Sequence, residues 1–231
     1  MSQTMDHDTA LRKSKVLLVD DHPIVRQGLA QLINDENDLV VCGQAEDTPQ
    51  ALSAARDTAP DIAIVDISLK DRSGIDVIQD LRGINASLPV LVLSMHNETL
   101  QAERALRAGA RGYIMKQEAT DKLLTAIRRV LAGDIYLSDR MATRMLHQLI
   151  DAKKSPAEMS PLHSLTNREL EIFTLIGQGK GPREIAGQFG LSVKTVEAHR
   201  EHIKQKLNLK TSNELIRHAM QYVMDQKSDQ T

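Results

Sequence analysis

The sequence has little cysteine, few aromatic side chains and no long apolar run. Its single cysteine among 231 residues, Cys42, excludes an internal disulfide, and its apolar surroundings predict an unreactive core thiol. With no tryptophan, two phenylalanines and three tyrosines, it lacks the side chains that normally line a pocket for a small apolar signal. No window approaches the roughly 18 apolar residues of a membrane span. The N-terminal residues also lack the apolar core of a signal peptide. We therefore expect a cytoplasmic protein with no membrane partner.

Length and charge point to two different domains. A chain of 231 residues exceeds one typical domain and suits two, each with enough apolar residues for a core. The segment up to Ile150 carries 17 basic and 21 acidic residues, whereas the remainder carries 12 basic and 10 acidic ones. A basic segment behind an acidic one fits a nucleic-acid-binding module joined to a different kind of domain.

The first half alternates short β-branched runs with amphipathic stretches, about five times between Lys15 and Gly133. This repeat predicts an α/β domain with a doubly wound, five-stranded parallel sheet of the flavodoxin-like type. In such a sheet the carboxyl ends of the strands share one edge, where ligands bind. We therefore expect the residues that end the strands to meet in one pocket.

Four of the predicted strands end at residues that phosphoryl chemistry uses: Asp20 with Asp21, Asp66, Ser94 and Lys116. Each residue alone would ordinarily be a turn or cap residue, or a surface lysine. Their occurrence at successive strand ends, in this order, favours a site for phosphoryl chemistry. Three crowded carboxylates repel one another, and Mg²⁺ is the natural hard cation to relieve that repulsion. Asp66 could then attack phosphorus while Lys116 and Ser94 bind the phosphoryl oxygens.

The motifs VLLVDD, the Ser73-Gly74 pair after the Asp66 strand, LVLSMH and AGARGYIMK resemble the receiver domain of two-component response regulators. The resemblance implies that Asp66 is the phosphoacceptor. It also implies that the Mg²⁺ ligands are Asp20, Asp21, Asp66 and the Ser68 backbone carbonyl. The phosphoryl-sensing and switch residues that it implies are Ser94, Tyr113 and Lys116.

Two positions near the predicted pocket bear on its kinetics. Receivers commonly have proline four residues after the phosphoacceptor, where this chain has Lys70. This change affects the expected shape of the loop. His96, two residues past Ser94, either gates the hydrolytic water or is an ordinary exposed loop histidine.

A linker is predicted between the two halves. The stretch from Asp139 to Leu149 is amphipathic and can form a helix leaving the first domain. The following KKSPAEMSPLHS has two prolines and three serines and no hydrophobic period, as is typical of a flexible linker. The expected division is a disordered tail over 1–13, the receiver domain over 14–133, a linker with a helix over 134–163 and a DNA-binding domain over 164–226.

Beyond Ser164 the pattern predicts an all-α domain of four helices with a helix-turn-helix. Gly190 can take the positive φ of a tight turn, and Ser192 can cap the third helix, Val193 to Lys206. One side of this helix is apolar, and the other would enter the major groove of DNA. The candidate DNA-binding residues are Lys180, Arg183, Lys194, Thr195, Glu197, Ala198, Arg200, Glu201 and Lys204.

The segment from Leu165 to Leu207 resembles the LuxR-type helix-turn-helix of the NarL/FixJ response regulators. Many positions carry this resemblance, among them Thr166, Arg168, Glu169 and Ser192. The resemblance implies a sensor histidine kinase and double-stranded DNA as partners, and a homodimer when phosphorylated. In the last helix it implies a dimerisation role for one apolar side: Leu215, Ala219, Tyr222 and Val223.

The leading hypothesis is a phosphorylation-controlled transcription regulator that is not an enzyme beyond its own phosphotransfer and dephosphorylation. One alternative is a magnesium-dependent phosphohydrolase or phosphotransferase acting on an exogenous substrate through Asp66, which leaves the C-terminal half unexplained. A second is a LuxR-type quorum sensor, which conflicts with the scarcity of aromatics. A third is a receiver that no longer phosphorylates, which conflicts with the intact acid, hydroxyl and lysine set. The sequence leaves open whether the inactive state is closed or extended.

Overall fold

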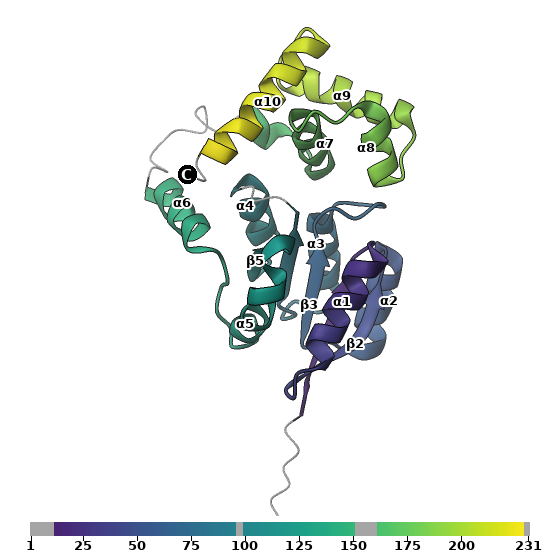
Figure 1. Cartoon of the computed structure of the whole chain (residues 1–231), viewed down its shortest axis with the longest axis vertical. Coiled ribbons are helices and arrows are strands. Elements are labelled where there is room, and N and C mark those ends of the chain that lie inside the picture. Colours follow the sequence, from purple (N-terminus) through teal and green to yellow (C-terminus); the bar gives the residue numbers. More distant parts are fainter. Residues whose placement is uncertain (1–11, 96–98, 151–160, 229–231) are drawn as a thin grey trace, which may run out of the picture.

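The structure is a computed structural model that describes residues 12–95, 99–150 and 161–228. It contains an N-terminal α/β unit and a C-terminal helical unit that lies over one end of it (Figure 1). The strands of the first unit are β1 (Ser14–Val19), β2 (Leu39–Ala45), β3 (Ile62–Asp66), β4 (Val90–Ser94) and β5 (Gly112–Met115). Its helices are α1 (Pro23–Asn34), α2 (Thr48–Thr58), α3 (Gly74–Ile84), α4 (Thr99–Ala108), the short η1 (Lys116–Glu118) and α5 (Ala119–Leu131).

The five strands form one parallel sheet in the order β2-β1-β3-β4-β5. This order confirms the predicted doubly wound, flavodoxin-like sheet. Strands β3 and β4 are buried along their whole length, which explains why they appear in the sequence as continuous apolar runs. Because all strands run the same way, the residues that end β1, β3, β4 and β5 lie along one edge.

Helices cover both faces of the sheet (Figure 1). The side chains of α1 and α5, such as Ile33 and Ile127, form one apolar core with the sheet. Those of α2, α3 and α4, such as Ala51, Ile78 and Ala102, form the other. Burial on both faces fixes the strand ends rigidly and so presents a stable site at the sheet edge.

Helix α6 (Asp139–Ile150) packs against the first unit instead of leaving it. Met141 is 3% exposed and belongs to the same core as Tyr113 and the alanines of α4. The sequence predicted the helix but not its docking, because the pattern of one amphipathic helix does not name its partner. The remaining predicted linker residues, 151–160, lie outside the described residues, as do residues 1–11 of the predicted tail.

The C-terminal unit consists of η3 (Pro161–Ser164), α7 (Asn167–Gly177), α8 (Pro182–Phe189), α9 (Val193–Lys206) and α10 (Ser212–Ser228). Phe173 and Phe189 are among its fully buried side chains. Thr166 and Glu169 form a capping box at the start of α7. Gly190 adopts φ +63° between α8 and α9, and Ser192 accepts a hydrogen bond from the Thr195 amide. The helix-turn-helix is therefore built as predicted. No helix in the described ranges is long and apolar enough to cross a membrane.

Candidate functional site

The four strand ends bring the predicted acidic pocket together. Lys116 Nζ donates to Asp66 Oδ2 at 2.7 Å and lies 2.7 Å from Asp20 Oδ2. Both carboxylates are almost completely buried, as are Asp21 and Ser94. The structure thus brings Asp20, which follows β1, and Asp66, which ends β3, to one lysine that follows β5, although these residues are up to 96 positions apart in the chain.

The backbone after Asp66 is held in place by a close approach to α3. A Cβ added to Gly74 would lie 2.1 Å from the Asp66 carbonyl oxygen, so only glycine fits there. Ser73 caps α3 by accepting from the Ile75 amide at 3.4 Å. The Ser68 amide donates to Asp66 Oδ1 at 3.2 Å and orients that carboxylate. The Ser73-Gly74 pair therefore fixes the loop that carries the candidate phosphoacceptor.

Burial and charge act against each other in the pocket. Burial raises the pKa of Asp66 above its usual range, although the ammonium of Lys116 opposes that rise. Burial lowers the pKa of Lys116, but the Asp66 and Asp20 carboxylates outweigh it and hold that pKa above its usual value. An excess of negative charge therefore remains near the buried carboxylates, because Asp21 lies beside them.

The residues at this edge fit a divalent cation. Donor atoms of Asp20, Asp21, His22 and Asp66 all lie within 4.8 Å of one another. Neither Asp21 oxygen accepts a hydrogen bond from the described residues, and both are buried. Buried carboxylate oxygens that accept no hydrogen bond are suitable ligands for a hard cation. The acidic cluster can therefore bind a metal ion.

His22 is the member of this cluster that the sequence did not single out. Its Nδ1 lies 2.8 Å from Asp21 Oδ1 and 3.2 Å from Asp20 Oδ1. The side chain is 53% exposed, so it lies on the solvent side of the buried carboxylates. Adjacency to the acid pair was the available signal. The predicted sensing residue Ser94 is buried at the end of β4. His96, for which the sequence left a water-gating role and an ordinary loop role open, lies outside the described residues.

Tyr113 is already inside the protein. It is 2% exposed and packs in the core shared by α3, α4 and α6, where Met141 also lies. Helix α6 packs against α4 on this side of the sheet and helps to cover the ring. The switch role of Tyr113 stays a prediction.

The predicted DNA-reading face of α9 is accessible. Lys194, Thr195 and Ala198 are exposed. Two basic side chains are instead held by neighbouring carboxylates: Arg200 Nε lies 3.6 Å from Glu197, and Lys204 Nζ lies 2.7 Å from Glu201. Two further predicted contacts lie on or before α8: Arg183 is exposed, and Lys180 donates to Gln188 at 2.6 Å.

The predicted dimerisation side of α10 packs within the helical unit, and its role in a dimer stays a prediction. Leu215 and Ala219 are 0% exposed within the helical core, and Tyr222 packs on Phe173 with ring centroids 5.8 Å apart. Val223 lies beside Gly177 of α7. These side chains stabilise the monomer because α10 crosses α7 closely. The exposed apolar residues of α10 are Ile216, Met220 and Met224.

The two units meet at an interface that the sequence did not reveal. Leu100 of α4 belongs to the apolar core of the C-terminal unit. Arg104 donates to the Leu162 carbonyl at 2.9 Å and to Asn167 Oδ1 at 3.2 Å. Asn167 donates to Asp76 of α3 at 2.9 Å. The molecule is therefore closed, with α7 seated on the ends of α3 and α4.

Arg168 and Glu171 of α7 occupy the centre of this interface. Arg168 donates to Glu171 Oε2 at 2.7 Å and to the Leu69 carbonyl at 2.8 Å. Its guanidinium also lies 4.1 Å from the centre of the Phe189 ring. Burial raises the pKa of Glu171 to about 7, and Arg168 only partly opposes that rise. A buried arginine thus contacts the loop that follows Asp66.

A parallel sheet with an acidic pocket at its edge, joined to a helix-turn-helix unit, defines a class of phosphorylation-controlled DNA-binding proteins. Residues 16–128 match the family described as "Response regulator receiver domain", and residues 163–219 match "Bacterial regulatory proteins, luxR family". The chain belongs to the two-component response regulators with a LuxR-type DNA-binding domain. It is a transcription regulator and not a classical enzyme.

Similar proteins cover between 60% and 91% of this chain. The chain is 35% identical over 209 residues to the oxygen regulatory protein NreC of Staphylococcus carnosus, covering 89% of this chain and 96% of that one. A LuxR-family two-component response regulator from Aurantimonas sp. SI85-9A1 is 33% identical, with a TM-score of 0.56 over 60% of this chain and 99% of that chain. RcsB of Salmonella typhimurium, at 23% identity and a TM-score of 0.62, shares the fold over 91% of this chain and 98% of its own.

Proposed function

We propose that Asp66 accepts a phosphoryl group from a sensor histidine kinase, and that phosphorylation controls dimerisation and DNA binding. The observation that carries the proposal is the position of Lys116, whose ammonium bridges Asp66 and Asp20 at 2.7 Å. A lysine there stabilises the charge that develops on phosphoryl oxygens during transfer. The Ser94 hydroxyl, at the end of the neighbouring strand, binds another oxygen of the modified side chain. Transfer breaks the donor's bond to phosphorus and forms one to an Asp66 oxygen.

Mg²⁺ is the proposed cofactor, held by Asp20, Asp21, Asp66 and the Ser68 carbonyl. When bound, it supplies positive charge that screens the phosphoryl oxygens from the carboxylates. The carboxylates of this chain position the cation, and the Ser68 amide keeps Asp66 oriented for attack. The same pocket supports self-catalysed dephosphorylation, since water can reach phosphorus from the solvent side.

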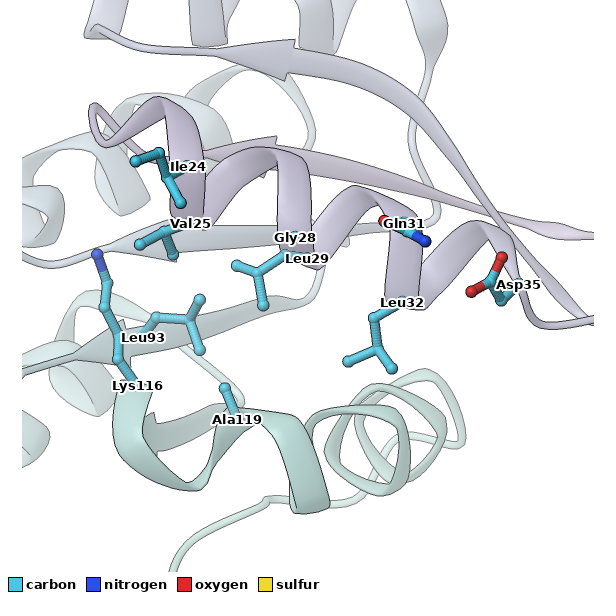
Figure 2. A pocket seen from close by; sticks show the side chains of 10 residues that line it. All are labelled: Ile24, Val25, Gly28, Leu29, Gln31, Leu32, Asp35, Leu93, Lys116 and Ala119. Atoms are coloured by element: carbon cyan, nitrogen blue, oxygen red, sulfur yellow. The ribbon is translucent and has the colours of Figure 1, made fainter.

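The kinase helix is proposed to dock on a groove between α1 and α5. Figure 2 shows Val25, Leu29 and Leu32 pointing from α1 toward α5, with Lys116 at one end. The groove encloses about 430 Å³. At its rim Ile24 is 85% exposed, two residues after His22. An amphipathic helix seated here would bring a histidine close to Asp66.

The proposed target is double-stranded DNA read by the outer face of α9, with Lys194 and Thr195 on phosphates and Glu197, Ala198 and Glu201 facing bases. Arg200 and Lys204 must first leave their carboxylate partners. RcsB has been solved bound to a promoter with a phosphate mimic, and that fold-level likeness agrees with this role. Such a task belongs in the cytoplasm. The proposed domain limits are 14–133 for the receiver and 164–226 for the DNA-binding unit.

The test of phosphorylation is intact mass after incubation with acetyl phosphate and Mg²⁺. We expect a single added phosphoryl group on the unmodified chain and none on Asp66→Asn, because the amide cannot act as the nucleophile. Excess chelator should also prevent labelling. Equal labelling of the Asn variant would rule out Asp66 as the acceptor.

Turnover of an exogenous phosphate ester is the outcome that favours the phosphohydrolase alternative. The carboxylates of Asp20, Asp21 and Asp66 are almost completely buried, which favours transfer to the protein itself. A control reaction with a generic aryl phosphate should therefore give no release above that of the Asp66→Asn variant.

A further inference from the structure

The loop after the candidate phosphoacceptor serves two sites at once. Lys70 Nζ lies 3.7 Å from Asp21 Oδ2, inside the reach of the cation pocket. The backbone carbonyls of Leu69 and Lys70 accept from Arg168 Nη2 at 2.8 Å and 3.3 Å. The side chain of Lys70 therefore reaches the candidate metal site, while its backbone carbonyl contacts the DNA-binding unit.

The C-terminal side of this contact is firmly held. Arg168 is 13% exposed, pairs with Glu171 at 2.7 Å and lies over the Phe189 ring. The helix-turn-helix turn also approaches the loop, because a Cβ built on Gly190 would lie 3.9 Å from Lys70 Cβ. Closure thus restricts both the backbone and the first side-chain carbon of Lys70.

The ammonium of Lys70 acts on the same oxygen that a divalent cation needs. Asp21 Oδ2 is buried and accepts no hydrogen bond from the described residues, and the ammonium of Lys70 lies 3.7 Å from it. A cation bound to Asp21 would lie within a few ångströms of this ammonium, and like charges at that range repel. The side chain is 55% exposed, which screens the repulsion and limits its size.

We propose that Lys70 is a built-in counter-ion of the acidic pocket in the closed molecule, so that divalent cation binding and domain closure oppose each other. The inference rests on the proposed function, which assigns the cation to this pocket. Closure holds the loop so that Lys70 reaches Asp21; opening releases the loop and the ammonium moves away. By thermodynamic linkage the cation must favour opening by the same factor by which closure weakens its binding.

The first test is the Mg²⁺ affinity of the full-length chain, measured by two-dimensional NMR titration. Lys70→Gln should bind Mg²⁺ about three- to tenfold more tightly than the unmodified chain, because a screened positive charge has been removed. Arg168→Gln should tighten binding in the same direction, by releasing the loop. The double variant should bind no more tightly than Lys70→Gln, because Arg168 acts through Lys70.

Arg72→Gln is the matched control. Arg72 lies in the same loop and carries the same charge, but it pairs with Asp80 at 2.6 Å, away from Asp21 and α7. It should leave Mg²⁺ affinity within about twofold of the starting value, as expected for a screened surface charge. Asp21→Ala should remove the titration and so verify that it reports on the pocket. Unchanged or weaker binding by Arg168→Gln, or additive effects of the two changes, would overturn the proposal.

A second measurement needs no substitution and so does not depend on a variant folding. Small-angle X-ray scattering of the unmodified chain should give a larger radius of gyration as Mg²⁺ rises, and Lys70→Gln should show a smaller increase. A radius that does not respond to saturating Mg²⁺ would refute the linkage. Acetyl phosphate labelling of Asp66 in the same samples tests the proposed function separately, since labelling can succeed whether or not Mg²⁺ opens the molecule.

Discussion

Glu171 is a buried acid whose environment depends on the contact between the two units. Its pKa of about 7 results from burial, with Arg168 opposing and Asp66 and Asp76 adding to the rise. Separation of the units would return the pKa toward its ordinary value of 4.5. Because closure raises this pKa, it favours proton uptake. The contribution of Glu171 to closure is fully present below the ordinary pKa of 4.5, and it is lost as pH rises from there to the raised pKa of about 7.

We therefore predict that the closed fraction falls between pH 4.5 and pH 7, the ordinary and the raised pKa of Glu171, as measured by the radius of gyration in solution. Glu171→Gln removes the ionisation while keeping the shape of the side chain, so its closed fraction should not respond over that range. A pH response of the variant equal to that of the unmodified chain would show that other groups control closure.

Gly74 is the residue whose replacement we expect to be least tolerated near the pocket. In Gly74→Ala the added Cβ meets the Asp66 backbone at 2.1 Å, so the loop or α3 must shift. We expect a loss of about 2–3 kcal/mol in unfolding free energy. Labelling of Asp66 should also fall, because the acceptor moves with its loop.

Gly83→Ala is the matched control in the same helix. Nothing lies within 4 Å of its added Cβ, and the helical backbone there suits alanine. The unfolding free energy should rise by about 0.5–1 kcal/mol in urea denaturation. Equal losses in the two variants would mean that the close approach at Gly74 is unimportant.

Among the helices, α10 offers two faces with different roles. Ala219 on the inner face lies in the core, whereas Met220 is 40% exposed and aligned with Ile216 and Met224. We propose that the outer face forms the dimer contact on DNA. Met220→Glu should then weaken binding to a two-half-site operator about tenfold, since it places two like charges in an apolar contact. Binding to one half-site should not change.

Gel-shift titration on the two DNA lengths measures this difference, and thermal unfolding checks that Met220→Glu remains folded. Ala219→Glu is the contrasting change. It should destabilise the helical unit itself, because it buries an unpaired charge. A loss of half-site binding by Met220→Glu would argue against a dimer role for the outer face.

Strands were easier to predict than helix partners. The apolar runs that stop at polar residues predicted strands β1, β3, β4 and β5 together with the residues that end them. This worked because parallel strands are buried on both faces, so their sequences are apolar throughout. Helices α6 and α10 show the opposite case: an apolar side was evident, but Met141 and Leu215 reveal that its partner lies within the monomer. The sequence did not predict that Arg168 and Glu171 lie in the interface between the units, because charged residues on a helix normally face solvent.

At the scale of the molecule, α4 contacts both the C-terminal helical unit and α6. Its Leu100 end lies under α7, and α6 packs beside it. A receiver dimer formed through α4 is therefore incompatible with the closed arrangement, and phosphorylation can promote dimers by selecting the open form.

We predict that beryllofluoride with Mg²⁺ shifts the chain from a compact monomer to a dimer in sedimentation velocity experiments. Asp66→Asn should remain monomeric under the same conditions, because it lacks the carboxylate that the mimic modifies. A compact monomer that binds a two-fold operator no better with the mimic would refute phosphorylation-driven dimerisation.

The burial of Leu100 by the other unit also bears on how the chain is made. Synthesis runs from the N-terminus, so the receiver can fold while α7 is still inside the ribosome. During that interval Leu100 faces water on a newly folded surface, available to chaperones or to another nascent chain. The helical unit, with its local contacts, then folds quickly and docks as a late step. Synthesis of the protein thus passes through a state in which the surface of α4 is exposed. Signalling is expected to expose the same surface again when the two units separate.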